Sequence, residues 1–308
     1  MGGWVDLVMK LSLLICIAIG LFGLVLYFKS PNPYYDPNKT HHTSTGFKNP
    51  YLKQDNQSKS FSDLFKMMTT ERPNPKPQIE KNLSIGSMIQ KINSNNNFIT
   101  WVGHSTMLLH INSKTILTDP IFSDRCSPVQ FLGPRRYSFP TIDIELLPKI
   151  DLIVISHNHY DHLDKNSVEI LGRNPLTVWY VPLGLKEWFN RLNIKNVIEL
   201  DWFEKRRQDN IEIICLPSQH WSKRSLFKSF DTLWSSWSLK VGNFKFWFAG
   251  DTGYNKIQFK KIGDKYGPFD LSAIPIGAYE PRWFMKSFHV NPEEAIFIHE
   301  DIKSEKSI

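Results

Sequence analysis

An apolar strand that runs directly into a cluster of histidine and aspartate side chains constrains this chain more than any other feature. Residues 151–156 read Asp-Leu-Ile-Val-Ile-Ser and lead into His157-Asn-His159-Tyr-Asp161-His162. Alternate residues of an extended segment point to the same face, so His157 and His159 can bind one metal ion. Asp161 and His162 follow where the chain bends and can bind a second. Because paired divalent ions activate water for hydrolysis, the motif predicts a two-metal hydrolase site in preference to a histidine-rich surface loop.

The composition predicts one substantial domain with an N-terminal appendage. The chain has 308 residues, of which 41% are hydrophobic and 13% aromatic, and this is enough to bury one core. The net charge of +7 falls mainly on residues 1–97, which carry 11 Lys/Arg against 6 Asp/Glu. Scattered basic charge beside an apolar segment suits an anionic lipid bilayer as partner. Since no dense basic run is present, we expect no nucleic-acid partner.

Residues 1–29 predict a membrane anchor. Leu11 to Phe28 form 18 consecutive uncharged, mostly aliphatic positions, long enough to span a hydrocarbon core as a helix. A cleaved signal peptide is the alternative, but its apolar region is usually shorter and ends in small residues, which Tyr27-Phe28-Lys29 does not provide. We therefore expect a membrane location with a single retained transmembrane helix, and the sequence does not predict on which side the domain lies.

Residues 30–97 are predicted to form a linker rich in Pro, Asn, Lys and Ser, in which prolines interrupt any long helix. A short helix is predicted over residues 60–68, with core packing as its expected role. Its apolar side chains recur at helical spacing: Phe61, Leu64, Phe65 and Met68. His41 and His42 lie in the polar part of this segment and are expected to be solvated.

Residues 98–308 are predicted to form the catalytic domain. Strands are predicted over 98–104, 106–111, 115–118, 151–156, 211–216 and 237–248, the last turning at Gly242-Asn243. Helices are predicted over 165–171, 184–192 and 292–301. The last of these has Asn291 as its cap and Pro292 in its first turn. Strands grouped before and between helices predict an α/β (α+β) domain with helices packed outside its sheets.

Several separated motifs resemble those of the metallo-β-lactamase superfamily. The general motifs are His157 to His162, Ser218-Gln-His220-Trp221 and Phe248-Ala-Gly-Asp251-Thr-Gly. Four further motifs resemble the N-acyl-phosphatidylethanolamine-hydrolysing phospholipase D family and its bacterial relatives: Trp101-Val-Gly-His104-Ser-Thr, Leu117-Thr-Asp119-Pro120, Gly133-Pro-Arg135-Arg136 and Ile274 to Trp283. The similarity runs from about Phe47 to the last residue. It implies a four-layer αβ/βα sandwich with a dinuclear, usually zinc, site at one edge of the sheets.

The resemblance also implies a set of metal ligands. It assigns His157, His159 and His220 to one zinc ion. Asp161 and His162 are assigned to the other, and Asp251 bridges them. Taken alone, His220 fits a packed histidine at a strand end equally well, and Asp251 fits a turn. Asp161 and Asp251 are the predicted catalytic residues, because a carboxylate beside the activated water can orient it and take its proton.

Further residues are assigned to the surroundings of the metals. Tyr160 and His289 resemble family positions that contact the phosphate or glycerol region of the substrate, although His289 also fits simple packing on Trp283. His104 and Asp119 are expected to orient the metal ligands by hydrogen bonding. The arginines at 135 and 136 fit phosphodiester binding and ordinary solvation equally well.

The function implied by the resemblance is zinc-dependent hydrolysis of the membrane lipid N-acyl-phosphatidylethanolamine to N-acylethanolamine and phosphatidic acid. Related sandwiches with the same ligands leave two alternatives open, a sugar-phosphate lactonase and a general metal-dependent phosphodiesterase. A truncated, non-catalytic membrane protein is the alternative from another class.

In this family a further histidine, from a strand after the helix at 292–301, completes the second metal site. The present sequence ends at Ser307-Ile308, and His299 lies inside the predicted helix. We therefore expect an incomplete C-terminus, a weakened second zinc site and little turnover compared with a version that carries the further strand. Comparable turnover by purified proteins of both lengths would contradict this expectation.

Overall fold

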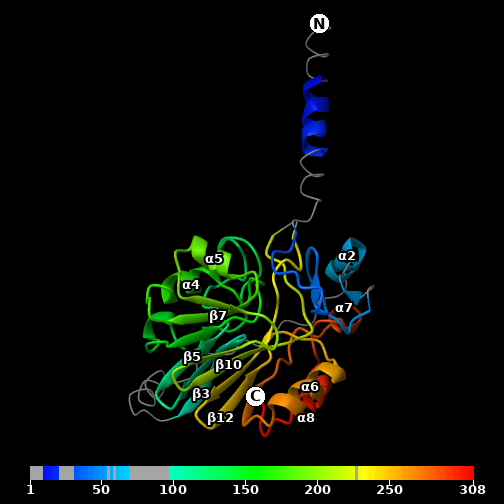
Figure 1. Ribbon diagram of the computed structural model, residues 1–308. Coiled ribbons are helices and arrows are strands. Elements are labelled where there is room, and N and C mark those ends of the chain that lie inside the picture. The colour runs from blue at the N-terminus through cyan, green and yellow to red at the C-terminus, as the bar shows by residue number, and fades with distance from the viewer. Residues whose placement is uncertain (1–9, 21–30, 54–55, 58–59, 70–96, 226–227) are drawn as a thin grey trace.

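Two β-sheets face each other at the centre of the fold, and helices lie on their outer faces (Figure 1). The computed structural model describes residues 10–20, 31–53, 56–57, 60–69, 97–225 and 228–308. Residues 10–20 form an exposed helix. Within the described residues no helix is both long and apolar enough to cross a membrane. The anchor predicted over Leu11 to Phe28 falls partly on residues 21–30, which lie outside the described part of the chain.

The first sheet has six strands whose spatial order follows the sequence. They are β3 (Phe98–Gly103), β4 (Thr106–Ile111), β5 (Lys114–Thr118), β6 (Leu152–Val154), β7 (Val178–Pro182) and β8 (Val197–Leu200). The pairs from β5 to β8 are parallel, so each needs a crossover connection. Two crossovers contain helices, α4 (Lys165–Leu171) and α5 (Lys186–Arg191), and α4 has the predicted bounds. The Asp164 side chain caps α4 by accepting a hydrogen bond from Ser167 N.

The second sheet has five strands in the order β13-β12-β11-β10-β9. They are β9 (Lys205–Gln208), β10 (Ile211–Leu216), β11 (Ser236–Val241), β12 (Phe244–Phe248) and β13 (Leu271–Ala273). The predicted hairpin between β11 and β12 is confirmed, with Gly242 at φ +61° in its turn. The helices α6 (Lys256–Tyr266) and α8 (Pro292–Asp301) pack on the outer face. The prediction of α8 is confirmed, including the Asn291 cap, which forms a capping box with Glu294.

Three apolar clusters hold four layers together. One fills the space between the sheets and is rich in aromatic side chains such as Trp237 and Phe246. A second joins the six-stranded sheet to α4 and α5, with Phe189 fully buried. The third joins the five-stranded sheet to α6 and α8 through Phe259 and Ile298. The remaining elements are short: β1 (His42–Thr43), β2 (Gly46–Phe47), α2 (Phe61–Thr69), the 3-10 helix η2 (Ile144–Leu146) and α7 (Arg282–Met285).

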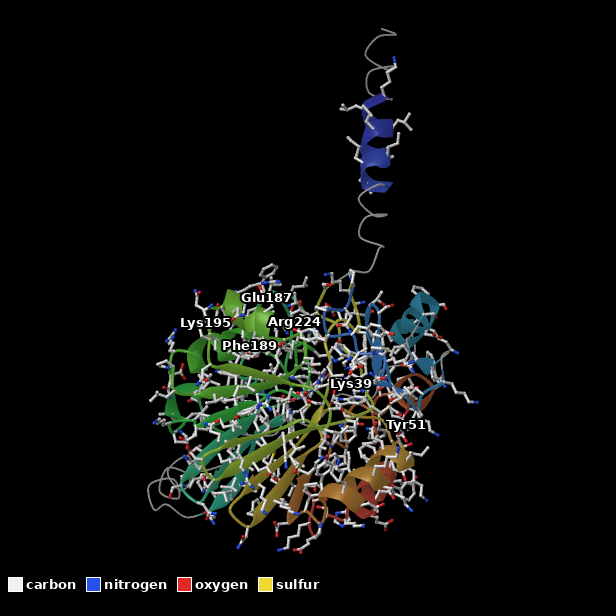
Figure 2. All side chains as sticks on the ribbon, viewed as in Figure 1. Lys39, Tyr51, Glu187, Phe189, Lys195 and Arg224 are labelled. Carbon is white, nitrogen blue, oxygen red and sulfur yellow. The ribbon has the colours of Figure 1, made fainter. Side chains whose placement is uncertain are left out.

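The segment before the domain packs against it through a buried carboxylate. Asp201, directly after β8, accepts hydrogen bonds from Lys39 Nζ at 2.6 Å and from the Nε2 atoms of His41 and His42 at 2.7 and 3.0 Å. Lys39 is labelled in Figure 2. The prediction that His41 and His42 are solvated is wrong, because their exposures are only 6% and 5%. A buried carboxylate needs donors, and these come from 160 residues earlier in the sequence. Sequence spacing alone does not reveal such a partner.

Replacing Asp201 with asparagine is expected to lower the free energy of unfolding by about 1–3 kcal/mol, because an amide has only one accepting oxygen. Burial raises the pKa of Asp201, but the hydrogen bonds from His41 and Lys39 outweigh burial and hold this pKa below its ordinary range. The stabilisation is therefore present at neutral pH and is lost as the pH falls below about 4. Urea unfolding at pH 7 measures the change. Asp264→Asn, at an exposed carboxylate, is the control, and equal midpoints for the two variants would contradict the expectation.

Candidate metal centre

All six predicted metal ligands lie at one edge of the sandwich, in loops that follow strands. The loop after β6 carries the ligands of the first motif, His220 follows β10, and Asp251 follows β12. β10 and β12 run in the same direction, since each pairs antiparallel with β11, so their ends meet at one edge of the sheet. The sheets are joined beneath the loop, where Ser235 N donates to Ser156 O and Trp237 Nε1 donates to Ile155 O, both at 2.9 Å.

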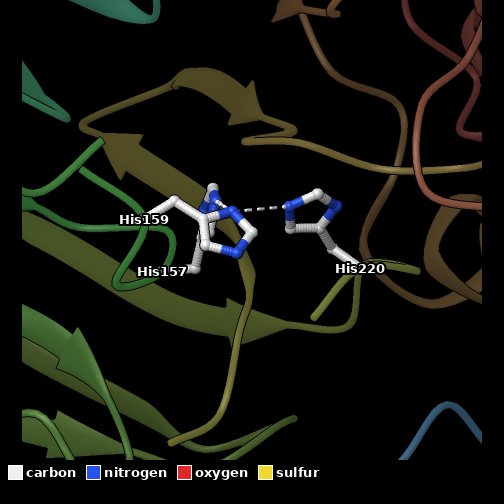
Figure 3. Close-up of side chains that lie close together, drawn as sticks. All are labelled: His157, His159 and His220. Atoms are coloured by element: carbon white, nitrogen blue, oxygen red, sulfur yellow. Dashed lines mark hydrogen bonds between the residues drawn. The ribbon is translucent and has the colours of Figure 1, made fainter. Parts of the chain in front are cut away.

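Three histidines converge on one point (Figure 3). The Nε2 atom of His157 lies 2.8 Å from Nδ1 of His159, and Nε2 of His220 lies 3.2 Å from the same atom. His157 and His220 are almost fully buried. This spacing between nitrogens is close to the separation of ligand atoms around one tetrahedral ion.

The proton positions favour a cation at this point. Nδ1 of His220 donates to the carbonyl oxygen of Phe288 at 3.0 Å, so neutral His220 directs a lone pair from Nε2. Nδ1 of His157 lies 2.8 Å from Ser156 Oγ, whose hydroxyl donates to Asp119, so Nε2 of His157 also carries a lone pair. A single proton on His159 can satisfy only one of these lone pairs. A metal ion can accept a lone pair from each of the three histidines, so these residues fit a bound metal ion.

A second group of ligands lies beside the first. Nε2 of His162 is 3.2 Å from Oδ2 of Asp251 and 4.0 Å from Oδ2 of Asp161. The same Oδ2 of Asp251 is 3.8 Å from Nε2 of His220. Asp251 therefore stands between the two groups, where a bridging carboxylate would stand. Nδ1 of His162 donates to Asp119 at 2.7 Å, which directs Nε2 toward the two carboxylates.

Burial and neighbouring charges shift the pKa values of the site in opposite directions. Burial lowers the pKa of His159 to about 4 and holds the pKa values of His157 and His220 well below the ordinary value. Burial also opposes a charge on His162, but the charges of Asp251 and Asp161 outweigh it and raise the pKa of His162 well above the ordinary value. For Asp161 and Asp251 burial raises the pKa, and the charge of His162 outweighs it, so both carboxyls are held below their usual range.

Zinc binding to the metal-free chain at pH 7 is expected to release about one proton. Three imidazoles and both carboxylates already have the form that binds metal, whereas His162 must first lose its proton. Titration calorimetry in buffers of different ionisation enthalpy measures the release. The number of protons should fall toward zero above the raised pKa of His162 and should rise again only below about pH 4, where His159 becomes charged. A binding enthalpy that is the same in every buffer would contradict the assignment.

Asp119 connects the ligands of both groups. Its carboxylate accepts hydrogen bonds from Nδ1 of His162 and from Ser156 N, both at 2.7 Å, and it is fully buried. The expectation that Asp119 orients the metal loop thus agrees with its contacts. His104 contacts the second group of ligands at a longer distance, with its Nε2 3.4 Å from Oδ2 of Asp161.

The predicted substrate residues lie in two different places. Nδ1 of His289 is 3.9 Å from Oδ2 of Asp251, beside the metal ligands. The Tyr160 hydroxyl instead donates to the carbonyl oxygen of Arg224 at 3.0 Å, and the Arg224 guanidinium lies 4.3 Å from the centre of the Tyr160 ring. Tyr160 and Arg224 line a cavity of about 690 Å³ that borders the metal loop at Asn158. Two residues of its lining, Arg224 and Glu187, are labelled in Figure 2.

The arginines at 135 and 136 are held by protein groups. Arg135 forms an ion pair with Asp124 at 2.7 Å, and Arg136 donates to the carbonyl oxygen of Ser138 at 2.8 Å. Sequence reasoning missed Asn49, whose Nδ2 donates to the backbone oxygen of His220 at 2.8 Å. No periodic or local signal marks Asn49, because its partner lies 171 residues later. The roles of the six ligands stay predictions, although the fold brings all of them together.

A family model described as the Beta-lactamase superfamily domain matches residues 114–308, more than half of the chain. The chain belongs to the metallo-β-lactamase superfamily. The match includes all six residues of the candidate metal centre. The ligand loops lie at one edge of the sandwich, as the resemblance of the motifs implies.

Two curated relatives and one solved structure are similar to this superfamily member. It is 47% identical over 221 residues to the N-acyl-phosphatidylethanolamine-hydrolyzing phospholipase D 1 of Caenorhabditis elegans, covering 68% of this chain and 62% of that protein. It is 38% identical over 211 residues to the N-acyl-phosphatidylethanolamine-hydrolyzing phospholipase D, mitochondrial, of Saccharomyces cerevisiae, covering 67% of this chain and 45% of that protein. The chain thus spans less than two thirds of either relative. The isothiocyanate hydrolase from Delia radicum gut bacteria shares the fold, with a TM-score of 0.53 and 15% identity. The match covers 68% of this chain and 83% of that protein.

Proposed function

We propose that this metallo-β-lactamase superfamily member is a zinc-dependent phosphodiester hydrolase that acts on N-acyl-phosphatidylethanolamine. The observation that carries the proposal is the position of Asp251 between the two groups of ligands. Similarity to two relatives whose names state this activity supports the substrate class. The products would be phosphatidic acid and N-acylethanolamine.

The donor set supports zinc as the metal. Imidazole nitrogens with few carboxylate oxygens and no thiolate suit zinc better than magnesium or calcium, which prefer oxygen ligands. His157, His159 and His220 would hold one ion, and Asp161 and His162 the other, with Asp251 shared. When bound, two zinc ions neutralise the phosphate and lower the pKa of water.

The residues of the chain would position the attacking water and the metal ligands, and would transfer a proton. The carboxylate of Asp251 is ionised at neutral pH and its Oδ2 faces both groups of ligands, so it can orient the attacking water and take its proton. Asp119 fixes the orientation of His162, and Phe288 O fixes that of His220. Because these contacts exist before substrate binds, little reorganisation is needed during the reaction.

The charge in the cavity beside the metal loop favours an anionic substrate. Arg224 lies between the rings of Tyr160 and Trp188, 4.3 and 4.9 Å from their centres. Burial lowers the pKa of Arg224 to about 10, so the guanidinium still carries its charge at neutral pH. A fixed cation between two aromatic rings suits a phosphate that is attached to apolar chains. The proposal places the enzyme at a membrane, where such a lipid resides, and residues 1–29 remain its predicted anchor.

The test is made on the purified chain loaded with zinc. N-acyl-phosphatidylethanolamine in mixed micelles is the substrate, and mass spectrometry measures phosphatidic acid and N-acylethanolamine. Equal amounts of both products, abolished by a chelator and restored by zinc, are expected. Hydrolysis of bis(p-nitrophenyl) phosphate without lipid turnover would favour a general phosphodiesterase. A chain that binds no zinc would favour the non-catalytic alternative.

A further inference from the structure

His104 occupies a strained position beside the metal centre. It lies in the turn between β3 and β4 with φ at +50°, in the left-handed region that few residues other than glycine adopt. The indole Nε1 of Trp101 donates to the backbone oxygen of His104 at 2.7 Å and holds the turn. The pairing of β3 with β4 shifts register between Trp101 and Gly103, just before this turn. Strain of this kind persists where the surrounding structure imposes it, which is common at functional sites.

The side chain of His104 points to the second group of ligands. Its Nε2 lies 3.4 Å from Oδ2 of Asp161, and its ring centre lies 5.1 Å from that of His162. The side chain is 45% exposed, so burial in the core does not explain its position. The exposure also leaves this face of the second group open to a substrate.

The distances decide between a hydrogen bond and a shared ion. A charge-assisted hydrogen bond between imidazole and carboxylate measures about 2.7–2.9 Å, as His162 and Asp119 show at 2.7 Å. The 3.4 Å between His104 and Asp161 is longer. Two ligand atoms that each lie about 2.0–2.2 Å from one tetrahedral ion are roughly 3.4 Å apart. His104, Asp161 and His162 each offer one ligand atom, and these three atoms lie within 4.8 Å of one another.

We propose that His104 is a ligand of the second metal ion, together with Asp161, His162 and the shared Asp251. This inference rests on the proposed function, since it assumes that two ions bind. It gives the second ion four protein ligands, two nitrogens and two carboxylates, which is the coordination number that zinc prefers. His104 then belongs to the metal centre itself and does not merely orient its ligands.

The cluster around Asp201 shows what a hydrogen-bonded alternative looks like. There the imidazoles of His41 and His42 contact the carboxylate directly at 2.7 and 3.0 Å, and Lys39 occupies the same oxygen as His42 at 2.6 Å. The ammonium group supplies the positive charge, so no ion is needed. At His104 no described lysine or arginine forms an ion pair with Asp161.

The test uses two substitutions that suit the backbone. His104→Gly and His104→Asn both tolerate a positive φ, so the imidazole is removed without new strain in the turn. His299→Asn, at a histidine on α8 that bonds Ser307, is the matched control. Zinc content and stepwise affinity are measured by atomic absorption and competition with a chelator, and the cobalt-substituted proteins are compared by visible absorption.

We expect two ions in the unaltered chain and in the control, and a more than hundredfold weaker second ion in both His104 variants. The first ion should stay bound, and added imidazole should restore the second ion and the cobalt bands in His104→Gly. A loss of only 10- to 100-fold, with unchanged cobalt bands and no rescue, is typical of a residue that orients a ligand and would overturn the assignment.

Two further outcomes separate this inference from the proposed function. Variants that keep two tightly bound ions and hydrolyse lipid would overturn the role of His104 and leave the hydrolase in place. An unaltered chain that binds one ion at every zinc concentration would also overturn it, and lipid turnover by the same sample then decides the proposed function separately.

Discussion

Replacing Asp251 with asparagine is expected to lower lipid turnover by at least about 10³-fold and to weaken the binding of both zinc ions. The Oδ2 atom of Asp251 lies 3.2 Å from Nε2 of His162 and 3.8 Å from Nε2 of His220. The amide has nearly the same shape but no charge, so it cannot neutralise two cations or accept the proton of water. The loss should therefore appear in turnover even at saturating zinc.

The measurement pairs turnover with zinc stoichiometry on the same samples. Asp209→Asn is the matched control, because its carboxylate is exposed and only pairs with Lys114 across the surface. Thermal unfolding of the zinc-free proteins shows whether either variant has lost its fold. An Asp251→Asn protein that is folded, binds two ions and retains more than a tenth of the turnover would show that Asp251 does not bridge the metals.

The metal loop could be predicted from the sequence because its ligands are nearly contiguous. A strand that ends in alternating histidines fixes their relative positions locally, and the bounds of α4 and the cap of α8 follow from similarly local signals. His220 and Asp251 required the resemblance, since each alone fits a structural residue. They join the site only because β10 and β12 end at the same edge of the sheet.

Contacts between distant segments were not predictable in the same way. Asp201 binds His41 across 160 residues and Asn49 binds the backbone of His220 across 171 residues. Neither pair has a periodic signal, and a polar composition suggested a solvated linker. The helix α6 was also missed, because lysines on its exposed face hide the apolar positions that contact the sheet, such as Phe259.

These long-range contacts connect the N-terminal segment to the metal centre. Asn49 lies two residues beyond Phe47, whose side chain is buried between the sheets and whose N–H donates to Phe230 O at 2.8 Å. The segment is thus fixed on both sides of Gly46, where any side chain would collide with the Phe230 carbonyl. Loosening this segment should affect His220 through its backbone, although no residue of the segment is a predicted ligand.

Replacing Asp119 with asparagine is expected to destabilise the zinc-free fold by about 2–3 kcal/mol and to weaken zinc binding by about 10- to 100-fold. Asp119 is fully buried and accepts from Nδ1 of His162 and from Ser156 N and Oγ. An amide cannot accept from all of these donors, and its own NH₂ group faces the proton on His162. His162 must then carry its proton on Nε2 in place of Nδ1, so that Nε2 no longer offers a lone pair to the metal.

Asparagine is the informative substitution because Asp119 has φ at +33°, where alanine would add backbone strain to the loss of the carboxylate. Urea unfolding with and without zinc separates the two effects. Asp264→Asn at the exposed pair with Lys303 serves as the control, and its unfolding midpoint should match that of the unaltered chain. Zinc should stabilise the variant less than it stabilises the unaltered chain at equal concentration, because binding energy adds to folding energy. If Asp119→Asn lost stability but kept its zinc affinity, Asp119 would support the fold alone, and the orientation of His162 would have to come from Asp251 and Asp161.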